Sequence, residues 1–275
     1  MELVTIRHNG GTRAGRIEQD VIVLLDAPTV KEVLTADGGL GGAATADGGE
    51  TVAVADADLA PVVPRPDKIV CVGVNYRDHI AEMGREVPGH PTYFAKYARA
   101  LVGPNDEIVL PPADVSTSID WECELALVIG RSARNVSGAD ALAAIAGFCV
   151  LNDVSVRDWQ RRTTQFLAGK TFEGLTPIGP SLVTSDQVGD GSGLALSTTV
   201  NGVVKQESNT SHLVFNAVDI VSDLSRVMTL DPGDVIATGT PGGVGAARTP
   251  PEYLKPGDEL VTTIEGLGRL VNRCR

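Results

Sequence analysis

The segment IDWECELALVIG, residues 119–130, is the most informative part of this sequence. Its second half is apolar and β-branched, as expected of a buried strand, yet two carboxylates stand near its start. Glu122 and Glu124 are two residues apart, so in a strand both point to one face, with α-carbons about 6.6 Å apart. Burying a carboxylate without a partner costs several kcal/mol, whereas a hard dication satisfies its oxygens directly. The segment therefore predicts a buried cation site or, alternatively, a solvent-facing strand end with salt-bridged glutamates.

A second apolar segment, GFCVLND at residues 147–153, also ends on a carboxylate. Asp153 makes a third hard ligand available. Three carboxylates without a set of histidines or cysteines select Mg²⁺ or Mn²⁺ over zinc, because hard cations prefer oxygen ligands. We therefore expect Glu122, Glu124 and Asp153 to hold Mg²⁺ or Mn²⁺, with water or substrate in the open positions.

Two residues close to these carboxylates are alternative ligands. Cys123 lies between the glutamates, but the alternation of side chains along a strand points it to the opposite face, which favours packing. Asp158 could replace Asp153 as a ligand. If residues 156–166 begin a helix, however, Asp158 lies inside that helix and is expected to pair with an arginine.

Outside these two segments, the sequence predicts many strands and few helices. It lacks the regular strand–helix alternation of a parallel doubly wound sheet, and VNGVVKQE predicts a hairpin with a turn at Asn201 and Gly202. We expect a β-rich α+β fold. Further strands are expected within residues 69–74, 195–202, 234–240 and 259–266. Helices are expected within residues 77–84, 137–145, 157–166 and 211–228.

The N-terminal part is expected to form a small β domain over residues 1–64. Two short strands are predicted at LVTIRH and VIVLLD, separated by a turn and a polar stretch. The glycine-rich segment 37–50 favours a flexible loop over any packed element. A Pro-punctuated stretch, LAPVVPRPDK, then leads into an apolar strand, which predicts a boundary near residue 65 and a larger domain over residues 65–275.

Composition excludes several classes of partner. The chain has 275 residues and a formal net charge of −12, which repels phosphate backbones and anionic lipid headgroups, so we expect no nucleic-acid and no membrane partner. The N-terminus lacks the pattern of a signal peptide and no apolar run reaches membrane-spanning length, which predicts a cytoplasmic protein. The four scattered cysteines are expected to be reduced thiols.

Six segments, in order, together resemble the fumarylacetoacetate hydrolase family over roughly residues 65 to 275. They are VCVGVNYRDHIAEMG, FAKYARALVGPNDEIVLP, DWECELALVIG, LNDVSVRDWQ, AGKTFEGLTPIGP and LDPGDVIATGTPGGVG. The resemblance is closest to the branch of acylpyruvate hydrolases, oxaloacetate decarboxylases and hydroxymuconate-type isomerases. It implies a mixed β-sandwich roll with a small N-terminal β domain, and subunits that form homodimers.

The resemblance also assigns roles to residues of this chain. The family's Mg²⁺ or Mn²⁺ ligands fall on the same three carboxylates identified above. The family's lysine falls on Lys170, where an ammonium would stabilise an enolate or oxyanion; the alternative is an exposed lysine in a polar loop. The family's lid dyad falls on His79 and Glu82, whose spacing of three places them on one face of a helix. Such a pair can activate water, although an exposed helix pair is the alternative.

Other residues are implied to line or border the substrate site. The glycine-rich loop TGTPGGVG, residues 238–245, would offer backbone amides and a threonine hydroxyl to a substrate carboxylate. In the longer enzymes that hydrolyse fumarylacetoacetate, the His and Glu come from distant segments, so their substrate does not transfer to this chain. The implied substrate-binding residues are Tyr76, Phe94, Lys96, Arg157, Gln160 and Thr240.

The function that these observations predict is divalent-metal-dependent hydrolysis of a C–C bond in an acylpyruvate-type 2,4-diketo acid, through a metal-stabilised enolate. The alternatives are decarboxylation of oxaloacetate and isomerisation of a 2-hydroxyhepta-2,4-diene-1,7-dioate, which use the same enolate and differ mainly in whether water is delivered. A protein that binds a 2-oxo acid without turnover is the alternative outside enzymes. In each case the expected partner is a small 2-oxo acid.

Overall fold

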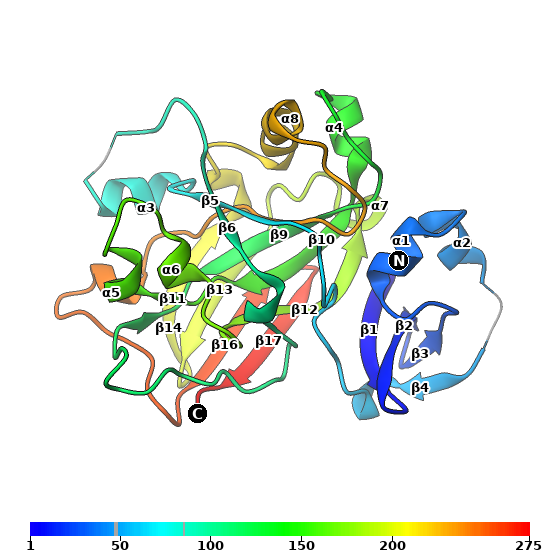
Figure 1. The fold of residues 1–275 in the computed structure, drawn as a ribbon, viewed down its shortest axis with the longest axis horizontal. Coiled ribbons are helices and arrows are strands. Elements are labelled where there is room, and N and C mark those ends of the chain that lie inside the picture. Colours follow the sequence, from blue (N-terminus) through cyan, green and yellow to red (C-terminus); the bar gives the residue numbers. More distant parts are fainter. Residues whose placement is uncertain (47–48, 85) are drawn as a thin grey trace.

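Strand β9, Cys123–Ile129, lies inside the main sheet and is buried along its whole length. The computed structural model describes residues 1–46, 49–84 and 86–275 (Figure 1). In these residues the main sheet has the order β4-β3-β2-β1-β12-β10-β9-β15-β5-β6, and β7 pairs with β12. The other strands of this sheet are β1 (Glu2–His8), β2 (Gly11–Glu18), β3 (Val21–Leu24), β4 (Thr51–Ala53), β5 (Ile69–Gly73), β6 (Thr92–Lys96), β7 (Leu101–Val102), β10 (Ile145–Asn152), β12 (Thr176–Thr184) and β15 (Val235–Ala237).

The side chains of β9 alternate between two hydrophobic clusters, one on each face of the sheet. Leu125 and Leu127 pack in the cluster that contains Ile220 of helix α8, Ala217–Val227. Ala126 and Val128 pack in the cluster that contains residues of helix α1, Val30–Thr35. Strands covered on both faces have nearly continuous apolar sequences, which explains the apolar run of this segment.

A second sheet and a two-stranded ladder lie beside the main sheet. The second sheet has the order β14 (Val203–Asn209), β13 (Ala195–Val200), β16 (Glu259–Ile264) and β17 (Gly268–Arg273). Its β13–β14 hairpin turns at Asn201 and Gly202, both with positive φ, which confirms the predicted hairpin. The two-stranded ladder pairs β8 (Ile119–Asp120) with β11 (Ser155–Val156).

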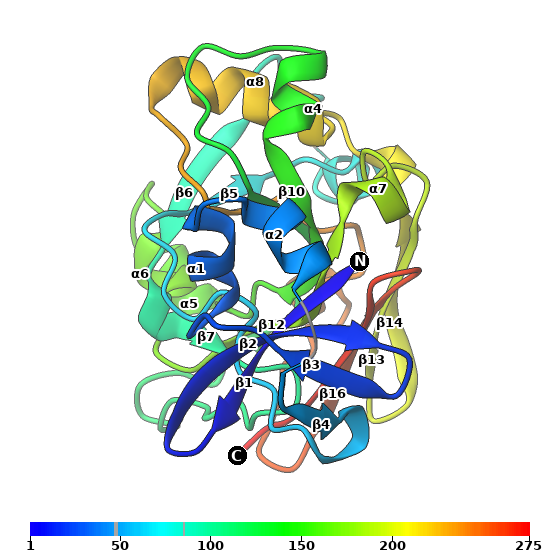
Figure 2. The same ribbon diagram turned by 90° about the vertical axis from the view of Figure 1, so that its right-hand side faces the viewer.

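Most helices are short, and two groups of them lie at different places around the main sheet. Helix α8 and helix α4, Ala139–Ala144, contact each other on one side of the main sheet (Figures 1 and 2). Helices α5 (Arg157–Gln160) and α6 (Leu167–Lys170) contact each other at the far end from the N-terminal strands, and α3 (Arg77–Glu82) lies at the same end (Figure 1). Helix α7, Ser185–Val188, follows β12.

The N-terminal strands extend the main sheet, because β1 pairs antiparallel with β12 (Figure 2). The polar stretch between the two predicted strands forms a strand of its own, β2, which pairs with both β1 and β3. The turn expected at the NGG segment forms at Asn9 and Gly10, both with positive φ. The polar stretch after it was not expected to be a strand, but antiparallel strands with one exposed face carry polar residues at alternate positions. The boundary that divides residues 1–64 from residues 65–275 stays a prediction.

The expectation of a flexible loop over residues 37–50 was wrong for its first half. Helix α2, Gly39–Thr45, forms there, although residues 47–48 lie outside the described part of the chain. Ala43 is buried in the cluster that contains residues of α1, and the Arg16 guanidinium donates to the carbonyls of Ala43 and Ala46. These contacts satisfy carbonyl groups at the end of a helix that glycine content alone disfavours.

Two expected helices are shorter than predicted. The segment 157–166 is helical only in α5, and a separate turn of helix, α6, follows. The segment 211–228 begins at the end of a 3-10 helix, Thr210–His212, and becomes α-helical only at Ala217, because Asn216 and Asp219 form a capping box that starts α8. The β-rich α+β class is nevertheless confirmed. No helix in the described residues is long and apolar enough to span a membrane.

Candidate active site at the ends of β9 and β10

The three predicted metal ligands converge because β9 and β10 are antiparallel neighbours. The register pairs Glu124 with Leu151, and beyond this pair the Asp153 amide donates to the Glu122 carbonyl at 2.8 Å. Asp153 therefore lies opposite Glu122, on the face that Glu124 also uses. Each residue offers one carboxylate oxygen, and these oxygens lie within 4.8 Å of one another. All three side chains are buried.

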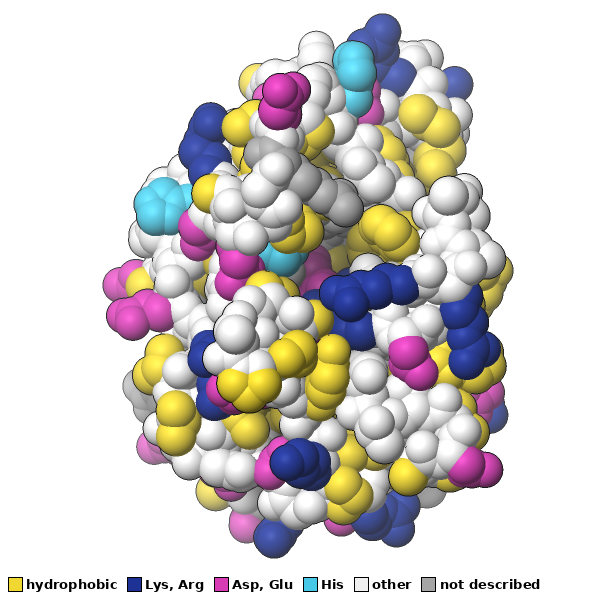
Figure 3. All heavy atoms as spheres, turned by 90° about the vertical axis from the view of Figure 1, so that its left-hand side faces the viewer, with side chains coloured by type: hydrophobic (Ala, Val, Ile, Leu, Met, Phe, Trp, Pro, Cys, Tyr) yellow, Lys and Arg dark blue, Asp and Glu magenta, His cyan; other side chains and the backbone are white. Residues whose placement is uncertain are grey.

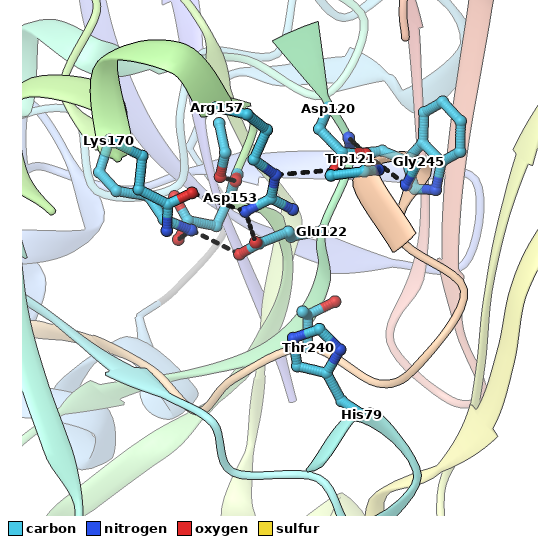
Figure 4. Close-up of polar contacts among 12 residues, drawn as sticks. His79, Asp120, Trp121, Glu122, Asp153, Arg157, Lys170, Thr240 and Gly245 are labelled. Carbon is cyan, nitrogen blue, oxygen red and sulfur yellow. Dashed lines mark hydrogen bonds and ion pairs between the residues drawn. The ribbon is translucent and has the colours of Figure 1, made fainter. Parts of the chain in front are cut away.

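Buried cations contact two of these carboxylates (Figure 4). The Lys170 Nζ lies 2.5 Å from Glu122 Oε2 and 2.7 Å from Asp153 Oδ2. The Arg157 Nη1 lies 2.6 Å from Glu122 Oε1, and the Lys96 Nζ donates to Asp153 Oδ1. Lys170 is 2% exposed, which rules out the alternative of a solvent-facing lysine in a loop.

The cations set the charge state of the residues they contact. Burial raises the pKa of Glu122, but Lys170 and Arg157 outweigh it and lower the pKa to about 2. Burial lowers the pKa of the Lys170 ammonium, and the Asp153 and Glu122 carboxylates outweigh it and raise the pKa above its usual range. The ion pairs therefore hold Glu122 and Lys170 in their charged forms.

Glu124 has a different environment from the other two ligands. In the described part of the chain no lysine or arginine forms an ion pair with it, and its Oε2 accepts from the Gly239 amide at 2.7 Å. Burial, and then the Asp153 and Glu122 charges, raise the pKa of Glu124 well above its usual range. A hard divalent cation held by the three carboxylates would remove this electrostatic cost, so the donor set fits Mg²⁺ or Mn²⁺.

A cavity of about 590 Å³ opens over the carboxylates. On the face that carries α3 and α5 the molecule is hollowed, and acidic, basic and histidine side chains meet in the hollow (Figure 3). Phe166 on the cavity wall packs edge to face against Phe94. The predicted site residues that line the cavity are His79, Glu82, Phe94, Glu122, Glu124, Arg157, Gln160, Lys170 and Thr240.

Three predicted site residues lie behind the cavity wall. Asp153 and Lys96 are buried and pair with each other. Tyr76 is fully buried in the core cluster under α8, so its position differs from that expected of a residue lining the site. Tyr76 therefore contributes to the core, and Lys96 reaches the site through its contact with Asp153.

The His79–Glu82 pair lies on α3, as its spacing predicted. The His79 Nδ1 lies 3.2 Å from Glu82 Oε2, and His79 points toward Glu122 and Thr240 (Figure 4). Because an ionised carboxylate only accepts, Nδ1 carries the hydrogen in this contact and Nε2 is left as the acceptor. Only 9% of His79 is exposed, which differs from the alternative of an exposed helix pair.

The glycine-rich loop was expected to offer its amides to a substrate carboxylate, but several of them bind carboxylates of the protein. The Gly239 amide donates to Glu124 and the Gly243 amide to Glu82. The Gly245 amide donates to Asp120 at 2.7 Å. The loop thus fixes side chains of the site. The Thr240 hydroxyl oxygen accepts from Gln206 at 2.8 Å, which leaves its hydrogen to donate into the cavity.

The two alternative ligands, Asp158 and Cys123, do not contribute to the carboxylate cluster. Asp158 accepts from the Ser116 hydroxyl at 2.7 Å, and the expected pairing with an arginine was wrong because α5 ends too soon to align one. Cys123 is buried on the opposite face, as alternation predicted.

Among the site-associated residues that the sequence analysis missed are Phe166, which lines the cavity, and Asp120. Asp120 is fully buried and contacts Arg157, Gly245 and Ala246. The sequence contained a pattern that could have identified Asp120. It precedes Glu122 by two residues, so strand alternation places both side chains on the same side of the chain.

The chain is similar to known proteins over most of its length. Residues 68–275 match the family described as fumarylacetoacetate hydrolase, C-terminal. The human mitochondrial oxaloacetate tautomerase FAHD2A is 51% identical over 217 residues, which cover 78% of this chain and 68% of that protein.

Several solved structures cover all of this chain. The fumarylacetoacetate hydrolase of Exiguobacterium antarcticum is 34% identical, with a TM-score of 0.88 over 99% of that chain. The 5-carboxymethyl-2-hydroxymuconate delta-isomerase of Mycobacterium smegmatis is 36% identical, with a TM-score of 0.81 over 98% of that chain. From the matched family region and these likenesses, we conclude that the chain is a member of the fumarylacetoacetate hydrolase family of enzymes.

Proposed function

We propose that this enzyme interconverts the keto and enol forms of a 2-oxo dicarboxylic acid of the oxaloacetate type. The observation that carries the proposal is the buried Lys170 ammonium between two carboxylates that fit a divalent cation. Tautomerisation requires negative charge to build up on the 2-oxo oxygen, and a fixed positive charge beside that oxygen stabilises it. A bound Mg²⁺ or Mn²⁺ would supply Lewis-acid polarisation of the same oxygen. The 51% identity to an oxaloacetate tautomerase supports this choice of substrate class.

His79 is the proposed proton carrier. With its Nδ1–H donated to Glu82, the Nε2 atom accepts the proton from C3 of the keto form and returns it to the oxygen of the enol. The Glu82 carboxylate also accepts from the Gly243 amide at 3.1 Å, so it is itself held in place while it orients the imidazole. This arrangement needs no second base.

Arg157 and Thr240 are the proposed contacts of the substrate carboxylate next to the oxo group. Both line the cavity. The Arg157 Nη2 is buried and has no hydrogen-bond partner among the described residues, and the Thr240 hydroxyl keeps a hydrogen to donate. A carboxylate that accepts from both would satisfy a donor that is otherwise costly to bury.

A second candidate is the hydrolysis of an acylpyruvate, which the sequence predicted as the leading activity. The His79–Glu82 pair favours it, because the same Nε2 atom could take a proton from water as the water attacks the distal carbonyl. The structural likeness to a fumarylacetoacetate hydrolase is in keeping with this candidate. Decarboxylation of oxaloacetate would use the same charge stabilisation without an attacking water.

One assay series separates these activities. The loss of the ultraviolet absorbance of enol-oxaloacetate is followed at fixed Mg²⁺ while pyruvate is measured in the same samples, with enzyme-free Mg²⁺ solutions as the control. Faster loss of the enol without pyruvate supports the tautomerase. Pyruvate from oxaloacetate instead indicates decarboxylation, and pyruvate from acetylpyruvate or fumarylpyruvate indicates hydrolysis. Binding without any turnover would overturn the enzymatic proposals.

A further inference from the structure

Asp120 ends a short strand directly beside the segment that supplies Arg157. In the β8–β11 ladder Asp120 pairs with Ser155, and the Arg157 amide continues the pairing with a 2.9 Å bond to the Ser118 carbonyl. Asp120 is 0% exposed. A fully buried carboxylate is costly unless its oxygens are satisfied, so its partners reveal what it holds.

Four donors converge on the Asp120 carboxylate (Figure 4). Its Oδ1 accepts from the Trp121 amide at 2.8 Å and from the Gly245 amide at 2.7 Å. Its Oδ2 accepts from the Ala246 amide at 2.9 Å and from the Arg157 Nε at 2.7 Å. One carboxylate thus connects the 245–246 loop, which lines the cavity at Ala246, with Arg157.

Asp120 uses only one edge of the Arg157 guanidinium. The Nη1 atom binds Glu122 and donates to Gln160 at 2.9 Å. The Nη2 atom is buried and without a hydrogen-bond partner among the described residues, although Arg157 lines the cavity. Fixing Nε and Nη1 of a planar guanidinium also fixes Nη2, because the three nitrogens share one rigid plane.

In the 245–246 loop, the backbone of Gly245 packs tightly against Asp120 and its other neighbours. A Cβ atom built on Gly245 would lie 2.0 Å from the Glu252 carbonyl oxygen and 2.8 Å from Asp120 Oδ1. The backbone therefore approaches the carboxylate at a distance that only glycine allows. The Trp121 indole also donates to the Gly243 carbonyl at 3.1 Å, which ties the same loop to the residue after Asp120.

We propose that Asp120 is a positioning residue of the active site, which orients Arg157 so that its Nη2 atom meets the carboxylate of a bound 2-oxo acid. The inference rests on the proposed function in one respect, the role of Arg157 as a substrate contact. It extends that function by explaining what orients Arg157. Asp120 holds the Nε atom of the guanidinium, and Glu122 and Gln160 hold the Nη1 atom.

The matched control is Asp234, a buried carboxylate away from the cavity. It is 1% exposed, accepts from the Asp231 amide at 2.7 Å and the Lys68 amide at 3.1 Å, and pairs with the Lys68 ammonium at 2.8 Å. Asp234→Asn and Asp120→Asn therefore remove the same charge from similar surroundings. Both substitutions are expected to lower the melting temperature.

The test measures the binding of pyruvate, which is an unreactive 2-oxo acid here, by calorimetry with the full chain in saturating Mg²⁺. Asp120→Asn is expected to weaken pyruvate binding about tenfold or more, the scale for losing a charge-assisted hydrogen bond, whereas Asp234→Asn leaves it unchanged. If Asp120→Asn does not fold, Asp120→Ser replaces it, because its hydroxyl still accepts from a backbone amide.

A double-mutant cycle decides whether Asp120 acts through Arg157. In an Arg157→Gln background, Asp120→Asn should add little further loss of pyruvate affinity, because the group that it positions is already absent. Equal losses for the Asp120 and Asp234 variants, additive losses in the cycle, or no pyruvate binding by the wild type would each overturn the inference. The absence of oxaloacetate turnover, with pyruvate binding intact, would overturn the tautomerase proposal alone.

Discussion

The two walls of the cavity are built in different ways. The strand wall takes Glu122 and Glu124 from one segment, and Asp153 lies directly behind it on the ladder partner, so backbone hydrogen bonds fix the positions from which all three project. The opposite wall is the six-residue helix α3, which carries His79 and contacts the glycine-rich loop through the Glu82 carboxylate. The difference indicates that the strand wall holds the charged groups in place, whereas the helical wall supplies the proton carrier.

The strongest test of this comparison removes a ligand from the strand wall. Asp153→Asn should weaken Mg²⁺ affinity by about 10²-fold or more, since even residues that only support metal ligands change affinity by 10–100-fold. Metal titration by calorimetry measures this change. Chelation should abolish turnover by the wild type, and Mg²⁺ or Mn²⁺ should restore it. Full activity in excess chelator, or unchanged affinity in the variant, would contradict the metal assignment.

The next largest effect is expected for Lys170. Its ammonium contacts Glu122 and Asp153, so it is grouped with the strand wall. Lys170→Met should lower kcat by about 10²-fold, the scale for losing one group that stabilises an oxyanion. It also leaves Glu122 and Asp153 with one fewer buried cation, so added Mg²⁺ should raise the melting temperature of the variant more than that of the wild type. Unaltered kcat would refute the role in the reaction.

On the helical wall, the largest expected change is in proton transfer. His79→Ala and Glu82→Gln should each lower the rate of tautomerisation, or of acylpyruvate hydrolysis, by at least about tenfold, near the lower end of general-base effects. Decarboxylation of oxaloacetate, if present, should fall much less, because it needs no attacking water. Mg²⁺ affinity should stay constant in both variants. A matching loss of metal binding would show that the two walls do not act separately.

The smallest expected effect is on the stability of the metal-free protein. Melting temperatures should distinguish Glu122 from Glu124, although both belong to the strand wall. Cations lower the folded pKa of Glu122 to about 2, so its stabilisation is present above its unfolded pKa and is lost as the pH falls toward 2. Burial raises the folded pKa of Glu124, so its contribution is present at low pH and is lost as the pH rises. At pH 7, Glu122→Gln should therefore lower the melting temperature and Glu124→Gln should raise it.

Saturating Mg²⁺ provides the control for the two glutamine variants. The wild type should gain stability from the ion, and Glu124→Gln should lose most of that gain because it lacks a ligand. If Glu124→Gln lowers the metal-free melting temperature as much as Glu122→Gln does, Glu124 has a compensating partner other than a metal ion.

The local sequence was informative where the spacing of residues decides their geometry. Glu122 and Glu124 share a face because strand side chains alternate, and His79 and Glu82 meet because helical residues three apart are neighbours. The same reasoning failed for Asp158, because the length of α5 depends on what packs around it. It also failed for α2, whose formation is aided by Arg16, a residue on a different element.

What the sequence determined by itself was the β-rich fold class, the family and the chemical types of the site residues. Tertiary structure decided which of these residues touch. The β9–β10 register set Asp153 opposite Glu122, and the joining of distant segments surrounded both with Lys170 and Arg157. The physical reason is that periodicity fixes the direction of a side chain along its own element. The partner on another element depends on how strands pair and helices pack, which no single segment encodes.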